Sequence, residues 1–257
     1  MAACERICGE VDDVLTKAEV ELANRQIEEH SKIIKEDTEP WEMEAEGPSP
    51  RMVGGLDISY LKCDPIEEEY KAGFLAVKEA PHLVSVVEEF QAEHPEVKLD
   101  VVLVDGNGTL HPRRFGSACS VGLSLNLAAV GVAKNLLHIP ELGVLRDKSI
   151  EQQLHYGERR SIQEDLDAVM LKTSRDSFRP VYVSIGHRIS IDTAAQLVLR
   201  CCKTRIPEPI RFADATSREV LRRWKGSTEI PKPLEEVDVD YITKSCSHGF
   251  NKRRLPH

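Results

Sequence analysis

The sequence predicts an α/β fold in which a sheet with parallel segments is covered by helices. Short apolar runs typical of buried strands alternate with stretches that are apolar at helical spacing. The clearest strands are predicted at 53–61, 99–104 and 180–185, and the clearest helices at 73–93, 117–125 and 191–202. The run 99–104 is almost continuously apolar and ends in Asp-Gly-Asn-Gly, a turn signal. This alternation is typical of a sheet with parallel segments and helices on its faces.

The remaining patterns divide the chain into four parts. Residues 1–36 contain an amphipathic helix at 11–36, and 37–52 carry three prolines and form a linker. We expect one catalytic domain at 53–225 and a disordered tail at 226–257, because the tail is polar and patternless. Within the domain, further strands are predicted at 128–133 and 168–172 and a helix at 217–224, whereas 138–179 is otherwise poorly patterned.

The charge of the chain is unevenly distributed. The net charge is −9, and residues 1–50 account for all of it with fourteen acidic and five basic side chains. The remainder is balanced and can present a basic face to a polyanion. The sequence has no apolar run long enough to span a membrane, and the spacing of its seven cysteines suits reduced thiols. We therefore expect no membrane partner, a monomer, and a cytoplasmic and nuclear location, with the nucleolus included as an alternative.

Three carboxylates are candidates for a metal site. Asp57 lies inside an apolar strand, Asp105 ends a buried strand, and Glu79 lies on a helix. Taken singly, each has an ordinary interpretation: a polar strand position, a turn residue and a solvated helix residue. Together, two Asp on neighbouring strands with a helical Glu nearby suit Mg²⁺, which prefers hard oxygen ligands. The set predicts a metal-dependent nuclease, although such clusters are generic to phosphoryl-transfer enzymes.

Basic residues follow several of the predicted strands. Arg113 and Arg114 come soon after Asp105 and suit bidentate binding of phosphate. Lys134 ends a strand and suits charge neutralisation on a cleaved phosphate. His187 follows another strand, where it suits a ligand or a proton shuttle. Each is a solvated surface charge in its ordinary interpretation, and their common position at strand exits favours function.

The motifs together resemble the endonuclease V family. The matching blocks, in the family's order, are GGLDISY (54–60), YKAGFLAVKE (70–79), VDGNGTLHPRRFGSAC (104–119), VGVAK (130–134), VSIGHR (183–188) and RIPEPIRFAD (205–214). The resemblance implies an RNase H-like fold and hydrolysis of the second phosphodiester 3′ to a hypoxanthine base, with Mg²⁺ as cofactor and Mn²⁺ as a substitute. Bacterial members act on deoxyinosine in DNA and animal members favour inosine in RNA. The stretch 200–211 resembles the animal branch, so single-stranded RNA containing inosine is the expected partner and deoxyinosine DNA the alternative.

The resemblance also implies roles for individual residues. Asp57, Glu79 and Asp105 correspond to metal and catalytic carboxylates, and Lys134 and His187 to groups that assist them. Tyr70 corresponds to a wedge that separates strands. The residues expected to contact the nucleic acid are Tyr70, Gly106, Asn107, Gly108, His111, Arg113 and Arg114.

One segment departs from the family pattern. An RNase H-like sheet opens with a three-strand antiparallel meander, and here only residues 62–69 separate the first strand from Tyr70. Eight mostly polar residues are too few for two strands and a turn, so part of the meander is expected to be missing. The first strand then becomes an edge, Asp57 stays beside Asp105, and stability falls. This shortening favours an alternative function, a non-cleaving inosine-RNA binding protein, and a nuclease with another substrate is a third hypothesis.

Overall fold

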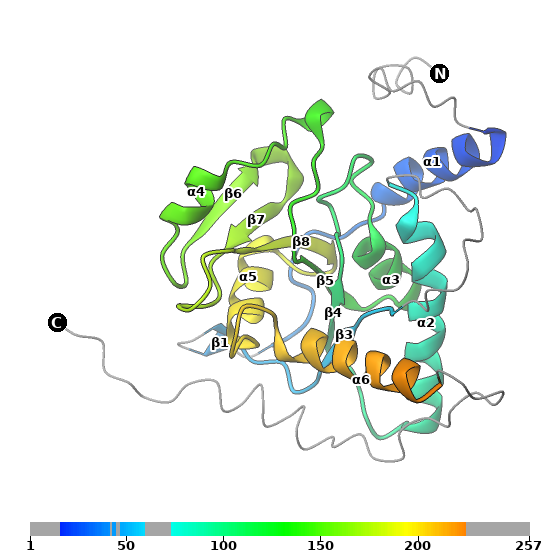
Figure 1. Cartoon of the computed structure of the whole chain (residues 1–257). Coiled ribbons are helices and arrows are strands. Elements are labelled where there is room, and N and C mark those ends of the chain that lie inside the picture. Colours follow the sequence, from blue (N-terminus) through cyan, green and yellow to red (C-terminus); the bar gives the residue numbers. More distant parts are fainter. Residues whose placement is uncertain (1–15, 42, 45–46, 60–72, 225–257) are drawn as a thin grey trace.

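A six-stranded mixed sheet with helices on both faces forms the body of the molecule (Figure 1). The computed structural model describes residues 16–41, 43–44, 47–59 and 73–224. The strands, in spatial order, are β3 (Val53–Leu56), β4 (Val101–Asp105), β5 (Ala128–Ala133), β8 (Val181–His187), β7 (Ala168–Leu171) and β6 (Arg159–Gln163). β3, β4 and β5 run parallel, and β8 pairs antiparallel with β5 and β7. A separate hairpin joins β1 (Met43–Glu44) to β2 (Gly47–Pro48).

Side chains cap the first turn of some of the helices. They are α1 (Lys17–His30), α2 (Leu75–Glu93), α3 (Ser117–Leu125), α4 (Lys148–Gln153), α5 (Ile191–Arg200) and α6 (Glu208–Trp224), with short 3-10 turns at Pro140–Leu142 and Glu164–Leu166. Thr16 and Glu19 form a reciprocal capping box at the start of α1. Ser190 caps α5 by accepting a hydrogen bond from the amide of Thr193. None of the helices in the described part of the chain is long and apolar enough to cross a membrane.

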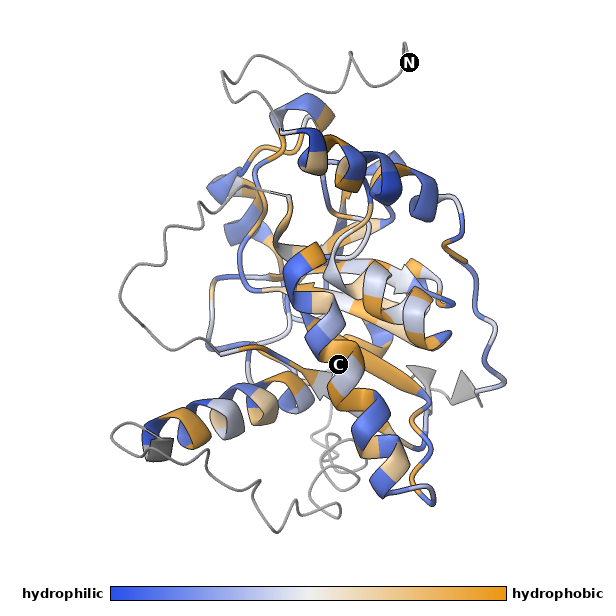
Figure 2. Ribbon diagram, turned by 90° about the vertical axis from the view of Figure 1, so that its right-hand side faces the viewer, coloured by the Kyte–Doolittle hydropathy of each residue, from blue (hydrophilic) through white to orange (hydrophobic). Residues whose placement is uncertain are grey.

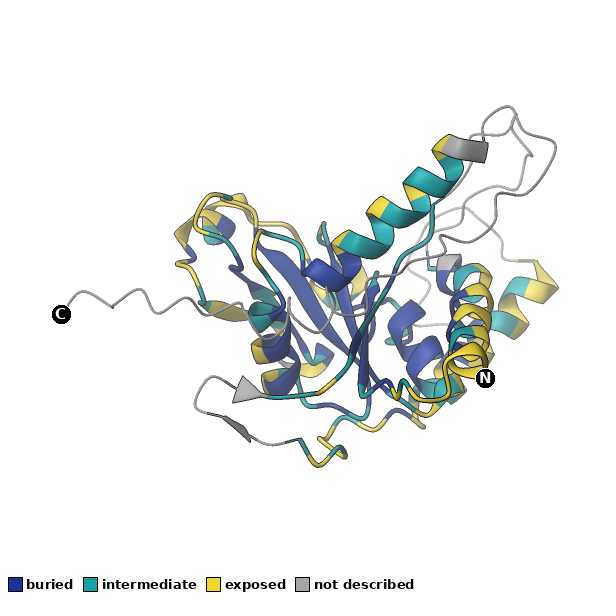
Figure 3. Ribbon diagram, turned by 90° about the horizontal axis from the view of Figure 1, so that it is seen from below, coloured by how far each residue is buried: buried dark blue, intermediate teal, exposed yellow. Residues whose placement is uncertain are grey.

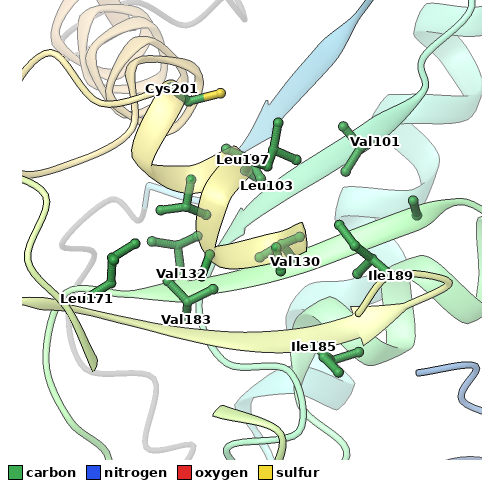
Figure 4. Close-up of a cluster of buried hydrophobic side chains, with 14 of the residues drawn as sticks. Val101, Leu103, Val130, Val132, Leu171, Val183, Ile185, Ile189, Leu197 and Cys201 are labelled. Carbon is green, nitrogen blue, oxygen red and sulfur yellow. The ribbon is translucent and has the colours of Figure 1, made fainter. Parts of the chain in front are cut away.

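Apolar side chains fill both sides of the central strands. On one side, Val102 and Val104 of β4 pack with Leu83 of α2. On the other, Leu103 and Val130 lie beside Leu197 of α5 (Figure 4). The strands and the inner helix faces are buried (Figure 3), and the outer helix faces are hydrophilic (Figure 2). The continuous apolar run of β4 is buried because helices cover both faces of this strand.

Most predicted elements are confirmed, and α6 is longer than predicted. The sequence predicts a helix at 217–224, whereas the helix begins at Glu208. Pro209 falls in the first turn, where a proline costs no intrahelical hydrogen bond. The poorly patterned stretch 138–179 contains α4 and β6 in addition to the predicted strand.

The predicted linker 37–52 is a packed segment in its first residues. Asp37 accepts hydrogen bonds from Ser190 and Thr193 at the start of α5. Glu39 forms an ion pair of 3.0 Å with Arg188, whose Nε also donates to Thr38. These contacts bind residues 37–39 to the end of β8 and the start of α5, so this part of the predicted linker is packed against the domain.

The first strand lies at an edge of the sheet among the described residues. β3 pairs only with β4 there, in parallel, with Leu56 opposite Val104. The predicted proximity of Asp57 to Asp105 is therefore confirmed. The shortened segment 62–69, Tyr70 and the predicted disordered tail at 226–257 lie outside the described residues.

The start of α6 lies against the backbone of β3 at Gly55. A Cβ atom built there would stand 2.1 Å from the carbonyl oxygen of Pro209. At the neighbouring Gly54 a Cβ would meet only side-chain atoms, those of Val102 at 3.2 Å and of Leu99 at 3.4 Å. The close approach of helix and strand therefore requires glycine at 55.

We expect Gly55→Ala to destabilise the protein by about 2 kcal/mol or more, since backbone atoms must move to remove the clash. Gly54→Ala is the matched control and should change stability by less than about 1 kcal/mol. Urea unfolding of both variants measures the difference. Equal stabilities would show that α6 does not depend on this contact.

Candidate active site

Two carboxylates and an ammonium group meet at one edge of the sheet. β3, β4 and β5 run in the same direction, so Asp57, Asp105 and Lys134 emerge at the same edge. Asp57 directly follows Leu56, which pairs with Val104, and Asp105 is the last residue of β4. The carboxyl ends of parallel strands are where α/β proteins place their sites.

Lys134 is paired with one of the two carboxylates. Its Nζ lies 2.5 Å from Oδ2 of Asp105. Burial lowers the pKa of Lys134, but the hydrogen bond and the negative charge of Asp105 outweigh it and the pKa is raised. Lys134 therefore stays charged and offsets part of the negative charge at this edge.

The surroundings of Asp57 raise the pKa of its carboxyl group. Partial burial is the largest cause that raises its pKa, followed by the charge of Asp105, and together they bring it to about 7. Hydrogen bonds with Asp105 and Asp214 act in the same direction, while Lys134 opposes them. One ammonium group is thus too little for the carboxylates gathered here, and a further positive charge would stabilise them.

Asp214 is the site residue that was missing from the predicted set. It lies on α6, and the packing of that helix against Gly55 brings it to Asp57. Its Oδ1 also accepts a hydrogen bond of 2.6 Å from Arg218. The sequence signal for it is its position as the last residue of the 205–214 block.

A cavity of about 280 Å³ joins Glu79 to the two strand carboxylates. Glu79 lines it from the first turns of α2, opposite Asp57 and Asp105. The other lining residues are Gly73, Ala76, Gly106, Asn107, His111, Gly116, Ser117 and Leu137. The structure therefore brings all three predicted carboxylates to one cavity, including Glu79, which follows the shortened segment.

The donor set fits a hard divalent cation that keeps several waters. No three His, Cys, Asp or Glu side chains among the described residues stand as a complete ligand cage. Mg²⁺ needs no such cage, because it is usually held by one or two carboxylates with waters and phosphate oxygens. Asp57 and Asp105 supply such a pair, and the raised pKa of Asp57 indicates a local deficit of positive charge.

The loop after β4 forms one wall of the cavity through tight backbone contacts. The amide of Gly108 donates to Oγ of Ser184 at 2.9 Å, and a Cβ at Gly108 would overlap the carbonyl oxygen of Ile185. Gly108 thus anchors the loop to β8 rather than lining the cavity. Asn107 does line it, and its buried Oδ1 has no hydrogen-bond partner among the described residues.

His111 is a fixed part of the wall. Its Nε2 lies 3.0 Å from the carbonyl oxygen of Gly73, and the amide of Arg113 donates to its Nδ1. Burial, reinforced by the charge of Arg113, lowers the pKa of His111 to about 3. The ring is therefore neutral at physiological pH and donates to Gly73.

The two arginines that were predicted to hold phosphate make internal contacts instead. Arg113 donates to Gln26 of α1 and to Gly73, both at 2.5 Å, and its guanidinium stacks on Phe74. Arg114 donates at 2.6 Å to the carbonyl oxygen of Asp165. Carbonyl and amide acceptors of the folded chain surround the guanidinium of Arg113, so its contact with phosphate stays a prediction. Arg114 is partly exposed but is also held by the protein.

His187 is not brought to the carboxylates, and this expectation is corrected. β8 runs antiparallel to β5, so His187 pairs with Ala129 at the start of β5. Lys134 is five residues beyond Ala129, so at about 3.3 Å per residue His187 lies about 16 Å along the strand direction from Lys134. Its Nδ1 accepts a hydrogen bond from the amide of Ile34, and burial lowers its pKa. It is a neutral packing residue.

Comparison with known proteins identifies the relatives of this chain. The family model described as Endonuclease V matches residues 59–215, more than half of the chain. The chain belongs to the endonuclease V family. Endonuclease V of Mus musculus is 36% identical over 239 residues, covering 81% of this chain and 70% of the relative. Endonuclease V of Homo sapiens is 35% identical over 232 residues, which cover 78% of this chain and 82% of the relative.

Solved structures of this family share the fold. The catalytic domain of human endonuclease V superimposes with a TM-score of 0.75 at 31% identity, covering 82% of this chain and 99% of that one. Ciona intestinalis endonuclease V was solved with DNA that contains an inosine followed by a ribo-adenosine. It superimposes with a TM-score of 0.71 at 30% identity, covering 81% of this chain and 99% of that one. The predicted RNase H-like fold is confirmed, and this endonuclease V family member is a nuclease.

The charge repulsion at Asp57 predicts an unusual pH dependence of stability for the metal-free protein. The pKa of Asp57 is 3.8 ordinarily and about 7 in the folded chain, so the folded state binds more protons between these values. Its contribution to the free energy of unfolding therefore falls as pH rises from about 4 to 7.

Asp57→Asn should consequently be more stable than the original protein near pH 8 in EDTA, with the difference shrinking toward pH 5. Thermal unfolding across this range measures it. Asp192→Asn, at a side chain on α5 that is 70% exposed and paired with Arg159, is the control and should shift stability by a similar small amount at every pH in this range. Parallel curves for Asp57→Asn and the original protein would contradict the electrostatic account.

Proposed function

We propose that this chain is a divalent-metal-dependent endoribonuclease that hydrolyses a phosphodiester 3′ to inosine in single-stranded RNA. The observation that carries the proposal is the pair Asp57 and Asp105 at the edge of the sheet, with Glu79 in the same cavity. The Ciona relative binds inosine-containing DNA, which supports a hypoxanthine-directed site. The stretch 200–211 resembles the animal branch of the family, whose members are expected to favour RNA, and this supports RNA over DNA.

Asp57 and Asp105 would hold the metal ion, with Asp214 and Glu79 close by. When bound, Mg²⁺ or Mn²⁺ supplies Lewis acidity and lowers the pKa of a water molecule. Asp57 must lose its proton to serve as a ligand, so below about pH 7 protonation of Asp57 competes with metal binding. The ammonium group of Lys134 lies at the same edge and offsets negative charge that develops on the phosphate.

Asn107 supports recognition of hypoxanthine. N1 of hypoxanthine carries a hydrogen, whereas N1 of adenine is an acceptor, so an acceptor in the pocket distinguishes the two bases. The buried Oδ1 of Asn107 lines the cavity and finds no partner within the described part of the chain. An unpaired buried acceptor is costly, and a base turned out of its stack would satisfy it.

The function is tested with labelled single strands of about 20 nucleotides. One RNA carries a single inosine, the matching DNA carries deoxyinosine, and an adenosine strand is the control. We expect Mg²⁺-dependent cleavage of the inosine RNA, weaker cleavage of the DNA, and none of the adenosine strand. Binding without cleavage of any strand would refute the enzyme and leave the non-cleaving binding protein. Preference for the DNA would reverse the substrate assignment.

Asp57→Ala and Asp105→Ala should each lower the cleavage rate by at least about 10³-fold, because each removes a metal ligand worth several kcal/mol in the transition state. Asp192→Ala is the matched control, since its carboxylate lies on α5 and is exposed. Circular dichroism confirms that the variants fold. A variant at either site residue that cleaves at the control's rate would remove that residue from the site.

A further inference from the structure

A second surface at the same sheet edge combines exposed aromatic rings with cations. We call it the edge platform and define it as Tyr156, Lys172, Arg175, Phe178 and Arg179. Phe178 is 79% exposed and Tyr156 is 44% exposed. Exposure of so much aromatic surface is unfavourable in water unless a partner covers it.

The sheet topology places the edge platform beside the active site. Asp105 pairs with Val132, which pairs with Val183 on β8. Farther toward the same edge, Leu171 at the end of β7 pairs with Val181. The loop 172–180 therefore leaves the sheet at the edge that holds Asp105 and Lys134. β7 stands three strands from β4, which is about 14 Å at ordinary strand spacing. Figure 1 shows β7 beside β8, away from β3.

Each ring of the edge platform is in contact with a cation. Nζ of Lys172 lies 5.5 Å from the ring centroid of Phe178, and the guanidinium carbon of Arg175 lies 4.8 Å from that of Tyr156. The two loops are joined, because the amide of Gly157 donates to Lys172 at 2.8 Å and that of Lys172 donates to Glu158 at 3.0 Å. These backbone bonds hold the two loops together, and because Lys172 is buried, Arg175 and Arg179 are the exposed cations of the edge platform.

Arg205 connects this surface to the catalytic edge. Its guanidinium donates to the carbonyl oxygen of Pro180, at 2.9 Å, and also to the carbonyl oxygen of Lys134. Pro180 ends the loop that carries Phe178. The loop and the active-site lysine are therefore fixed to one side chain, which holds them in a constant relative position.

We propose that the edge platform binds the substrate strand beyond the cleaved phosphodiester, with bases stacked on Phe178 and Tyr156 and phosphates near the exposed guanidinium groups of Arg175 and Arg179. This rests on the proposed function for the identity of the strand. Segment 172–180 holds three basic residues and one acidic residue, in a chain of net charge −9. Aromatic rings interleaved with cations are how single strands are bound without sequence preference, and a flexible strand leaving the cavity would pass along this edge.

The test separates strand binding from cleavage. Fluorescence anisotropy measures binding of the full chain to an inosine-free single-stranded RNA of about 20 nucleotides in EDTA. Phe178→Ala should raise the Kd on the order of tenfold, because the stacking of one base on the ring is lost. Phe178→Trp keeps a ring and should stay within about twofold. Val86→Ala is the matched control, since Val86 is 58% exposed on α2 and outside both surfaces.

An unchanged Kd for Phe178→Ala, or an equal loss for Val86→Ala, would overturn the edge platform. Failure of the proposed function is distinguishable, because it would appear as absent cleavage of inosine RNA while the difference in strand binding persists. In the cleavage assay, Phe178→Ala should raise KM and leave kcat unchanged. A fall in kcat at constant KM would also overturn the proposal.

Discussion

The proximity of Asp57 and Asp105 is the constraint on which the site depends. The parallel register of β3 and β4 fixes it, because Leu56 lies opposite Val104 and each strand delivers its next residue to the same edge. The two carboxylates repel each other, and the half-buried position of Asp57 prevents water from screening this fully. The fold therefore maintains an unfavourable charge arrangement that a divalent cation relieves.

Much of the surrounding structure serves to hold this arrangement. The backbone contact at Gly55 places α6 so that Asp214 reaches Asp57. On the opposite wall, His111 and Arg113 both bind the carbonyl oxygen of Gly73, just before the helix that carries Glu79. His111 and Arg113, from the 104–119 block, thus hold the wall of the cavity in place through internal hydrogen bonds. Their rigidity keeps the cavity shaped for a substrate, which is what a preorganised site requires.

The sequence predicted the centre of the site better than its periphery, for physical reasons. Asp105 follows an apolar run typical of a buried strand, so its position at a sheet edge follows from the pattern. Asp57 was predicted inside the strand 53–61, whereas β3 ends at Leu56 and Asp57 comes directly after it. His187 also follows such a run, but periodicity does not encode strand direction, and β8 is antiparallel. Arg113 turns inward because Gln26 and Gly73 offer acceptors. Those residues lie far from it in sequence, and no local pattern reveals them. The helix α6 is longer than predicted, because a proline is tolerated in the first turn of a helix although it resembles a helix breaker.

Calorimetric titration of the full chain with Mn²⁺ near pH 7, in buffers of different ionisation enthalpy, tests the central claim most directly. The account predicts that Mn²⁺ binds and that binding releases a proton, because the pKa of Asp57 is about 7 before the metal arrives. Asp57→Asn should bind more weakly and release no proton, and Asp105→Asn should lose binding. Mn²⁺ uptake that is undiminished in both variants, or that releases no proton from the original protein, would contradict a metal site formed by these two carboxylates.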